Sequence, residues 1–120
     1  MHVNESAENY LETILMLSKT HPVVRSVDIA EELGFKKSSV SVAMKNLREK
    51  EHITVTKEGF IYLTETGRAI AEMIFERHEL ITQWLTSLGV DEKIASEDAC
   101  RVEHVLSPES FEAIKNFLNK

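Results

Sequence analysis

Two short amphipathic segments joined by a tight turn constrain the fold of this chain more than any other feature. The first, VDIAEEL, has apolar residues at helical spacing and is followed by Gly34, where a helix commonly ends on a left-handed residue. The second runs from Ser38 to Lys50 and places its apolar stripe at Val40, Met44 and Leu47. Two amphipathic helices joined by a turn that contains glycine are typical of a helix-turn-helix.

The flanking segments extend this pair to a winged helix-turn-helix. Before it, a first helix is predicted from apolar residues at helical spacing, at Tyr10, Leu11, Ile14, Leu15 and Leu17. After it, HITVTKEGFIYLTETG contains two β-rich runs separated by Lys57-Glu58-Gly59, which is typical of a hairpin with glycine in its turn. A long helix, capped by Thr64 or Thr66, then extends to Gly89.

Two more helices are predicted beyond Gly89. We expect Ser96 to cap the helix that contains EDACRVEH, and Ser107-Pro108-Glu109 to begin a last helix that ends at Leu118. The sequence therefore predicts a mainly α fold, a winged helix-turn-helix with a two-stranded β-wing followed by a helical subdomain. The expected domains are residues 1–66 and residues 67–120.

The charge of the chain is distributed unevenly. The formal net charge is -6, but residues 1–68 carry a net -1 and residues 69–120 carry -5. Within the first part, FKKSSVSVAMKNLREK has a local charge of +4, which suits contact with phosphate groups. The acidic total therefore does not exclude DNA binding.

Targeting features are few. No apolar run approaches the roughly 18 to 20 residues of a membrane span, and the first ten residues lack a signal-peptide pattern. A single cysteine cannot form an internal disulfide, so the fold needs no oxidising compartment. We expect a cytoplasmic protein with no membrane partner.

The second helix of a helix-turn-helix enters the major groove of DNA with its N-terminal residues towards the bases. A lysine run alone more often covers a solvated helix face, but the helix-turn-helix and the wing around this one favour DNA binding. Serines and an exposed valine can meet phosphates, base edges or thymine methyl groups. The residues that we expect to contact DNA are Lys36, Lys37, Ser38, Ser39, Ser41, Val42, Lys45 and Lys57.

The segment EDACRVEHVLS holds the only cysteine of the chain. Cys100, Glu103 and His104 fall within one arc of a helix, and thiolate, carboxylate and imidazole together suit divalent transition metals such as Fe(II), Zn(II), Co(II) or Ni(II). By itself the spacing also fits a buried cysteine, a solvated glutamate and a capping histidine that lie together by chance. On this motif alone, the chance interpretation is favoured.

Two other functions of Cys100 are weighed. A cysteine and a histidine could form a nucleophile and its base, but no orienting third group or glycine-rich oxyanion turn accompanies them, so we expect no enzyme activity. Direct oxidation of Cys100 is the stronger alternative, which would make the chain a winged-helix regulator that responds to redox state and not to metal. Its acidic neighbours disfavour the reactive thiolate.

Three more polar residues lie on helix arcs that are expected to face the core. Asn9 and Glu12 are one turn apart in the first predicted helix, and His78 interrupts the apolar stripe of the long helix. Each could instead be solvated or paired by itself. A single metal ion shared by three packed helices would satisfy several such groups at once, because buried polar groups need partners.

Together these segments resemble a known family. ENYLETIL, SVDIAEELGFKKSSVS, ERHELITQWL and EDACRVEHVLS are similar to the diphtheria toxin repressor and manganese transport regulator family, over roughly residues 5–118. The resemblance implies a homodimeric repressor whose first domain binds double-stranded operator DNA and whose second domain binds metal and dimerises. It implies no other protein partner. In such proteins the metal is the corepressor that shuts off metal-uptake genes.

The resemblance also implies the ligands, by position. The residues that match the metal-binding positions are Asn9, Glu12, His78, Cys100, Glu103 and His104. Cys100 is typical of the iron-responsive branch and Glu12 of the manganese-responsive branch. We expect Fe(II), with Mn(II) as the alternative and Zn(II) or Co(II) as substitutes in vitro, because a thiolate favours Fe(II) over Mn(II).

Some positions depart from the family pattern. Asn9 stands where the branches have Met or Asp, so it would be a neutral, weaker ligand. Thr82 and Ser96 stand where the iron branch has an acid and a histidine in a second site, which is therefore expected to be absent or rebuilt around Glu12 and His78. Many iron-branch members continue into an SH3-like domain, so this chain is expected to be the short, two-domain form.

Overall fold

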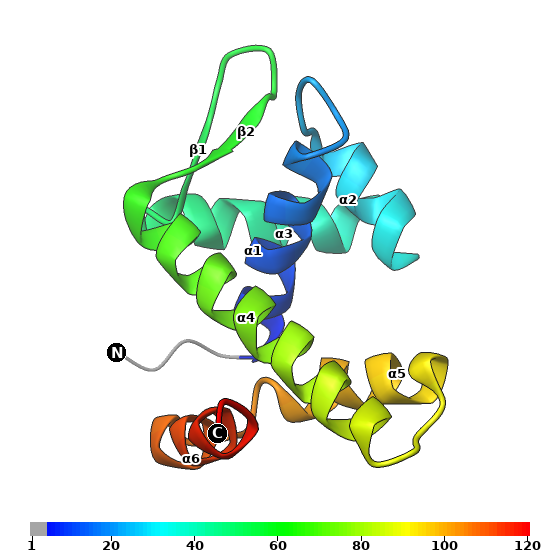
Figure 1. The fold of residues 1–120 in the computed structure, drawn as a ribbon. Coiled ribbons are helices and arrows are strands. Elements are labelled where there is room, and N and C mark those ends of the chain that lie inside the picture. Colours follow the sequence, from blue (N-terminus) through cyan, green and yellow to red (C-terminus); the bar gives the residue numbers. More distant parts are fainter. Residues whose placement is uncertain (1–4) are drawn as a thin grey trace. The chain divides into compact units, whose positions relative to one another are not determined.

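The computed structural model describes residues 5–120, which form six helices and one two-stranded hairpin (Figure 1). The predicted fold class, a mainly α winged helix-turn-helix followed by a helical subdomain, is confirmed. Contacts divide the chain into two compact units, one ending at Glu72 and one beginning at Met73, and each is described by itself. None of the helices within residues 5–120 combines the length and the apolar character that crossing a membrane requires.

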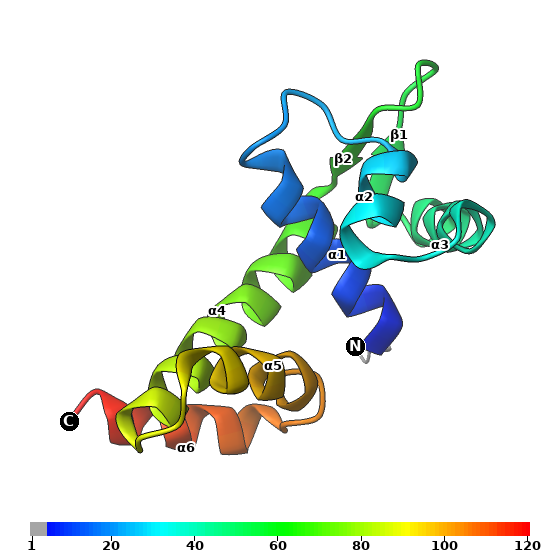
Figure 2. The ribbon, with the colours of Figure 1, turned by 90° about the vertical axis from the view of Figure 1, so that its right-hand side faces the viewer.

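The first unit is built on three helices, α1 (Glu5–Ser18), α2 (Ser26–Leu33) and α3 (Lys37–Glu49). Gly34 has a φ of 69° and its N–H donates to the Ala30 carbonyl, which ends α2 as the sequence predicts. In Figure 2, α3 is seen nearly end-on beside α2. The side chains that bury these helices against one another include Leu11, Ile14, Ile29, Val40 and Ile53.

The wing consists of β1 (Ile53–Val55) and β2 (Ile61–Leu63), paired antiparallel with Thr54 opposite Tyr62. Gly59 supplies the positive φ, 87°, in the connecting turn. The hairpin is attached to the chain just before α2 because the Ile61 N–H donates to the Val24 carbonyl, at 2.8 Å. The Arg25 guanidinium also lies over the Phe60 ring, 4.9 Å from its centre.

A tight corner joins α3, the wing and the start of α4 (Glu65–Ser87). Glu51 adopts a left-handed conformation with a φ of 63°, and its carbonyl accepts hydrogen bonds from the Thr64 and Thr66 hydroxyls. Thr64 also accepts from the Gly67 N–H, so Thr64 is the residue that caps the long helix. Gly67 packs directly on the backbone of His52, and a Cβ on Gly67 would collide with the His52 carbonyl oxygen.

The second unit contains residues 73–87 of α4 together with α5 (Glu92–Val102) and α6 (Pro108–Leu118). Ser107 caps α6 as predicted, accepting from the Ser110 N–H. The prediction that Ser96 caps the preceding helix is wrong. Asp91 caps α5 by accepting from the Lys93 N–H, so the helix begins five residues earlier than expected and Ser96 lies in its middle.

A buried arginine joins the three helices of this unit. The Arg77 guanidinium donates to the carbonyls of Glu103 and Leu106, at 3.0 and 2.8 Å, and lies over the Phe111 ring. At the surface, Lys115 of α6 pairs with Glu76 of α4 at 3.1 Å. The hydrogen bond and the charge of the Glu76 carboxylate raise the pKa of the Lys115 ammonium above its usual value.

Candidate metal centre and nucleic-acid interface

Three side chains with metal-ligating atoms meet within the second unit. His78 extends from α4, Cys100 lies in the last turn of α5, and Glu103 is the residue that ends α5. The Nδ1 atom of His78 lies 2.9 Å from Oε1 of Glu103 and 3.8 Å from Sγ of Cys100. One ligand atom from each residue lies within 4.8 Å of the other two, which is close enough for a single ion to bind all three.

Glu103 is the most unusual member of this cluster. Its side chain is completely buried, and its Oε2 atom accepts no hydrogen bond within the part of the chain that the structure describes. The Nε2 atom of His104 lies 3.8 Å from that oxygen, which is too far for a hydrogen bond. A buried carboxylate without a full set of partners is costly, and a divalent cation would satisfy it. The residues present therefore fit a metal ion.

The chemistry of the donor atoms narrows the choice of metal. One thiol, one carboxylate and one or two imidazoles form a mixed set that suits Fe(II), Co(II), Zn(II) or Mn(II) better than Mg(II) or Ca(II), which prefer oxygen ligands only. The thiol and the imidazole must be deprotonated to bind, so binding would release protons.

Of the six residues predicted to bind metal, the second unit holds His78, Cys100, Glu103 and His104. The structure places Asn9 and Glu12 in the first unit, half-buried and one turn apart on α1. Their part in a ligand set stays a prediction. The expected helical arc is also modified, because α5 ends at Val102, so that Glu103 lies at its cap and His104 in the turn that follows.

Two residues that contact this cluster were not predicted from the sequence. Ser96, whose Oγ lies 3.3 Å from Nε2 of His78, stands one helical turn before Cys100, and that spacing could have placed it on the same face. Arg77 holds the backbone of Glu103. Arg77 stands next to His78 in an otherwise apolar stripe, and this pattern could have identified it from the sequence.

The predicted DNA-contacting residues are all exposed. Seven of the eight lie in α3 or at its N-terminal cap and one lies in the wing, namely Lys36, Lys37, Ser38, Ser39, Ser41, Val42, Lys45 and Lys57. Val42 is the most informative, because 61% of this apolar side chain is exposed while Val40, Met44 and Leu47 are buried as expected. No side chain caps α3, so the N–H groups of its first turn are open to an anion such as phosphate.

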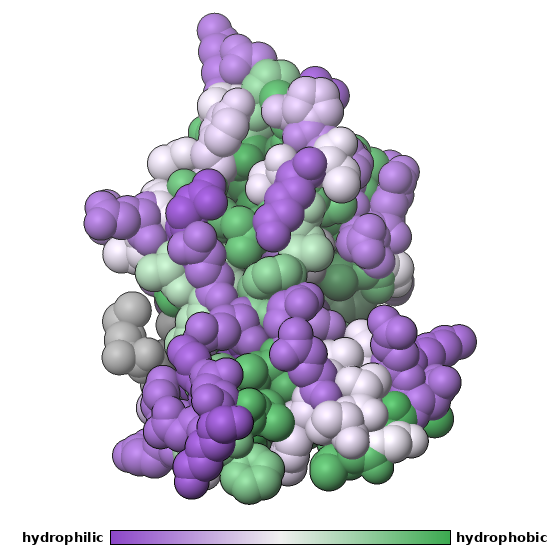
Figure 3. All heavy atoms as spheres, in the orientation of Figure 1, coloured by the Kyte–Doolittle hydropathy of each residue, from purple (hydrophilic) through white to green (hydrophobic). Residues whose placement is uncertain are grey.

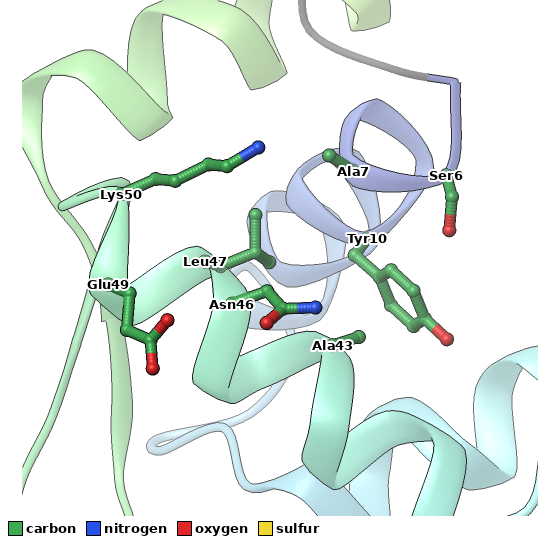
Figure 4. A pocket seen from close by; sticks show the side chains of 8 residues that line it. All are labelled: Ser6, Ala7, Tyr10, Ala43, Asn46, Leu47, Glu49 and Lys50. Carbon is green, nitrogen blue, oxygen red and sulfur yellow. The ribbon is translucent and has the colours of Figure 1, made fainter.

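A hollow also lies between α1 and α3 (Figure 4). Its lining combines one acid and one base with small, amide and apolar side chains, at Ser6, Ala7, Tyr10, Ala43, Asn46, Leu47, Glu49 and Lys50. No thiol or imidazole lines it. The metal-type ligands gather elsewhere, beside His78.

Two family models match the two parts of the chain. Residues 2–59 match the model described as the N-terminal DNA binding domain of iron dependent repressors, and residues 64–120 match their metal binding and dimerisation domain. The chain is 36% identical to an uncharacterised HTH-type transcriptional regulator of Methanocaldococcus jannaschii, over 98% of this chain and 96% of that protein. It is 37% identical to the HTH-type transcriptional regulator MntR of Bacillus subtilis, over 91% of this chain and 77% of that protein.

Solved structures give the same result. The manganese regulator SloR superposes with a TM-score of 0.84 at 28% identity, over 99% of this chain and 55% of that chain. A manganese-dependent transcriptional repressor in complex with manganese superposes with a TM-score of 0.87 at 26% identity, over 94% of this chain and 52% of that one. This chain thus spans about half the length of these two solved proteins.

Proposed function

The chain belongs to the family of iron-dependent repressors, and on that basis we propose that it binds double-stranded operator DNA as a homodimer when it is loaded with Fe(II) and thereby controls metal-uptake genes. The proposed domains are a DNA-binding domain over residues 1–66 and a metal-binding and dimerisation domain over residues 67–120. The observation that carries the metal-dependent part is the buried Glu103 carboxylate with its unpartnered oxygen beside His78 and Cys100.

His78, Cys100, Glu103 and His104 are the residues of the second unit that would hold the ion. When bound, the ion would supply positive charge beside the buried Glu103 carboxylate and would hold Cys100 as its thiolate. Arg77 fixes the backbone at Glu103, and the packing of α4 against the end of α5 brings His78 to the same point. These contacts bring the proposed ligands together before the ion binds.

The choice between iron and manganese is part of the proposal. The Cys100 thiolate favours Fe(II) over Mn(II), because soft ligands bind the later metal more tightly. Several relatives carry manganese in their names, so Mn(II) is the alternative. Zn(II) and Co(II) are expected to substitute in vitro.

We include Asn9 and Glu12 of α1 in the proposed ligand set on the strength of the family resemblance. The matched comparison is Glu12→Gln against Glu5→Gln, since Glu5 is an exposed acid on the same helix. If Glu12 binds metal, only the first substitution lowers the metal affinity. Equal affinities for both variants would remove Glu12 from the set.

The homodimer is supported by apolar side chains left exposed on the second unit. At Leu88, Ile94, Val105 and Phe117, between 52% and 71% of each residue is exposed. Figure 3 shows apolar atoms at the surface where Figure 1 draws α5 and α6. Large apolar side chains exposed together commonly mark an interface between proteins. Sedimentation velocity of the full chain would then show a dimer.

The direct test is an anaerobic titration of the metal-free protein with each metal, followed by fluorescence anisotropy with labelled operator DNA. We expect Fe(II) to strengthen DNA binding in the unmodified protein and to have little effect in Cys100→Ser and His104→Ala. Lys93→Ala, an exposed change on α5, is the control. DNA binding that ignores every metal would reject the corepressor role, and a response to peroxide instead would favour the redox alternative.

A further inference from the structure

We propose that Ser96 orients the imidazole of His78 for metal binding and is itself not a ligand. This inference rests on the proposed function, because it concerns the metal centre described above. It starts from the two ring nitrogens of His78, which face different groups. Nδ1 faces Glu103 and Cys100, whereas Nε2 lies 3.3 Å from Oγ of Ser96.

The position of one proton decides whether this ring can bind a metal. A neutral imidazole carries a single N–H, and only the other nitrogen has a lone pair. Because Nδ1 points at the other ligands, it must be the bare nitrogen, and the proton must then be on Nε2. A histidine that binds metal generally donates its other N–H to a nearby acceptor, which fixes both the tautomer and the ring orientation. Ser96 provides that acceptor.

In the metal-free protein the two neighbours act differently on the tautomer. The Glu103 carboxylate, 2.9 Å from Nδ1, attracts the proton to that nitrogen, where it blocks the metal. The Ser96 hydroxyl can donate to a bare Nε2 or accept from Nε2–H, so it keeps a hydrogen bond to the ring in either tautomer. Ser96 therefore stabilises the metal-binding form of the ring, in which Nε2 carries the proton and needs an acceptor.

The place of Ser96 in the fold suits this role. It lies on α5 one turn before Cys100, so the helix that carries the thiol also carries the hydroxyl that aligns the imidazole. Around Nε2 the structure forms a polar groove lined by His78, Thr82, Thr86, Glu92 and Ser96, among others. Thr82 and Thr86 direct their hydroxyls to carbonyls of their own helix, at 2.7 Å each, so Ser96 is the hydroxyl of this group that contacts the ring.

The test compares Ser96→Ala, Ser96→Thr and the control Thr86→Ala, which removes a hydroxyl from the same groove. Co(II) is titrated anaerobically into each full-length protein, and the thiolate-to-cobalt absorption measures affinity. We expect Ser96→Ala to weaken Co(II) binding by about tenfold, the low end for residues that act through a histidine ligand. Ser96→Thr and Thr86→Ala should bind within about twofold of the unmodified protein.

A second measurement uses the metal-free protein. The ¹⁵N shifts of the His78 ring report its tautomer, and we expect Ser96→Ala to move the population towards Nδ1–H. Unchanged Co(II) affinity and unchanged ¹⁵N shifts in Ser96→Ala would overturn the proposal. A changed cobalt coordination number in that variant would also overturn it, because the hydroxyl would then be a ligand. If the unmodified protein shows no thiolate-to-cobalt absorption, the metal centre itself is refuted.

Discussion

Glu103 shows how a single residue can be costly to one state of a protein and necessary to another. Its carboxylate is fully buried, with one oxygen near His78 and the other unpartnered within residues 5–120. The metal-free protein must accommodate this buried carboxylate, whereas the metal-bound protein would use it to hold the ion. The two states should therefore respond differently when the charge is removed.

We predict this difference for Glu103→Gln. The metal-free variant should unfold in urea within about 1 kcal/mol of the unmodified protein, because the amide oxygen can still accept a hydrogen bond from the His78 ring. Added Co(II) should no longer stabilise it, whereas the unmodified protein should gain about 2.7 kcal/mol at a hundredfold excess over the dissociation constant. Glu79→Gln, which changes an exposed acid on α4, should behave like the unmodified protein. A loss of 3 kcal/mol or more in metal-free Glu103→Gln would show that the carboxylate supports the fold itself.

Arg77 has a structural role that is independent of metal. We predict that Arg77→Met costs about 2–4 kcal/mol in the free energy of unfolding, because two buried carbonyls lose their donor and Phe111 loses a stacked partner. Urea denaturation of the metal-free protein measures this. Lys115→Met, which removes only the exposed pair with Glu76, should change stability very little. An Arg77→Met protein as stable as the original would contradict the assignment.

At the scale of elements, the corner between α3 and α4 depends on two backbone features. The first is the contact of Gly67 with the His52 backbone, which leaves no room for a side chain. We predict that Gly67→Ala destabilises the protein by about 2 kcal/mol or more, although alanine is the better helix former. The control Arg68→Ala is an exposed change in the same turn. Thermal unfolding of both variants separates packing from helix propensity, and an unchanged melting temperature for Gly67→Ala would exclude the close contact.

The second feature is the left-handed conformation of Glu51. Glycine adopts this conformation without the penalty that a side chain pays, so Glu51→Gly should stabilise the protein by up to about 1 kcal/mol. The same substitution two residues earlier, Glu49→Gly at the last residue of α3, should destabilise it by up to about 1 kcal/mol. Chemical denaturation of the pair tests the conformation by the sign of the change. A loss of stability in both variants would indicate that residue 51 does not adopt a left-handed backbone conformation.

These element-scale features also show where sequence reasoning stops. Helical periodicity located the helices and the wing because apolar residues repeat along each one, and Gly34 and Ser107 marked two ends correctly. The start of α5 was misplaced because Asp91 and Ser96 are both good caps, and only the fold selects between them. The positive φ of Glu51 could not be predicted, because no sequence pattern distinguishes a non-glycine residue that adopts this conformation.

At the candidate metal centre, too, some features could be predicted from the sequence and others could not. Spacing along the chain brought Cys100 and Glu103 together, and the interrupted apolar stripe of the long helix singled out His78. The resemblance to a family then matched these residues to metal-binding positions. The burial of the Glu103 side chain could not be predicted from the sequence. It depends on the packing of three helices, in which Arg77 contacts both the Glu103 carbonyl and the Phe111 ring. The contact between Ser96 and His78 joins two helices and is visible only in three dimensions.

For the whole molecule, the distribution of charge sets how DNA binding should depend on salt. The logarithm of a DNA association constant falls with the logarithm of salt concentration by about 0.9 for each phosphate neutralised. We predict that Lys57→Ala, in the wing, lowers the magnitude of this slope by about 1 when the protein is saturated with metal. Lys120→Ala, at the end of the acidic second unit, should leave the slope unchanged. Equal slopes for Lys57→Ala and the unmodified protein would mean that the wing does not touch phosphate.

Cys100 can serve as a specific labelling site at the candidate metal centre. It is the only cysteine in the sequence, and its side chain is exposed at the candidate metal centre. An alkylating reagent would therefore modify one atom of the protein, and a bound ion would shield that atom. The fraction alkylated inside intact cells, counted by mass spectrometry after growth on iron or on manganese, would report which metal occupies the protein where it works.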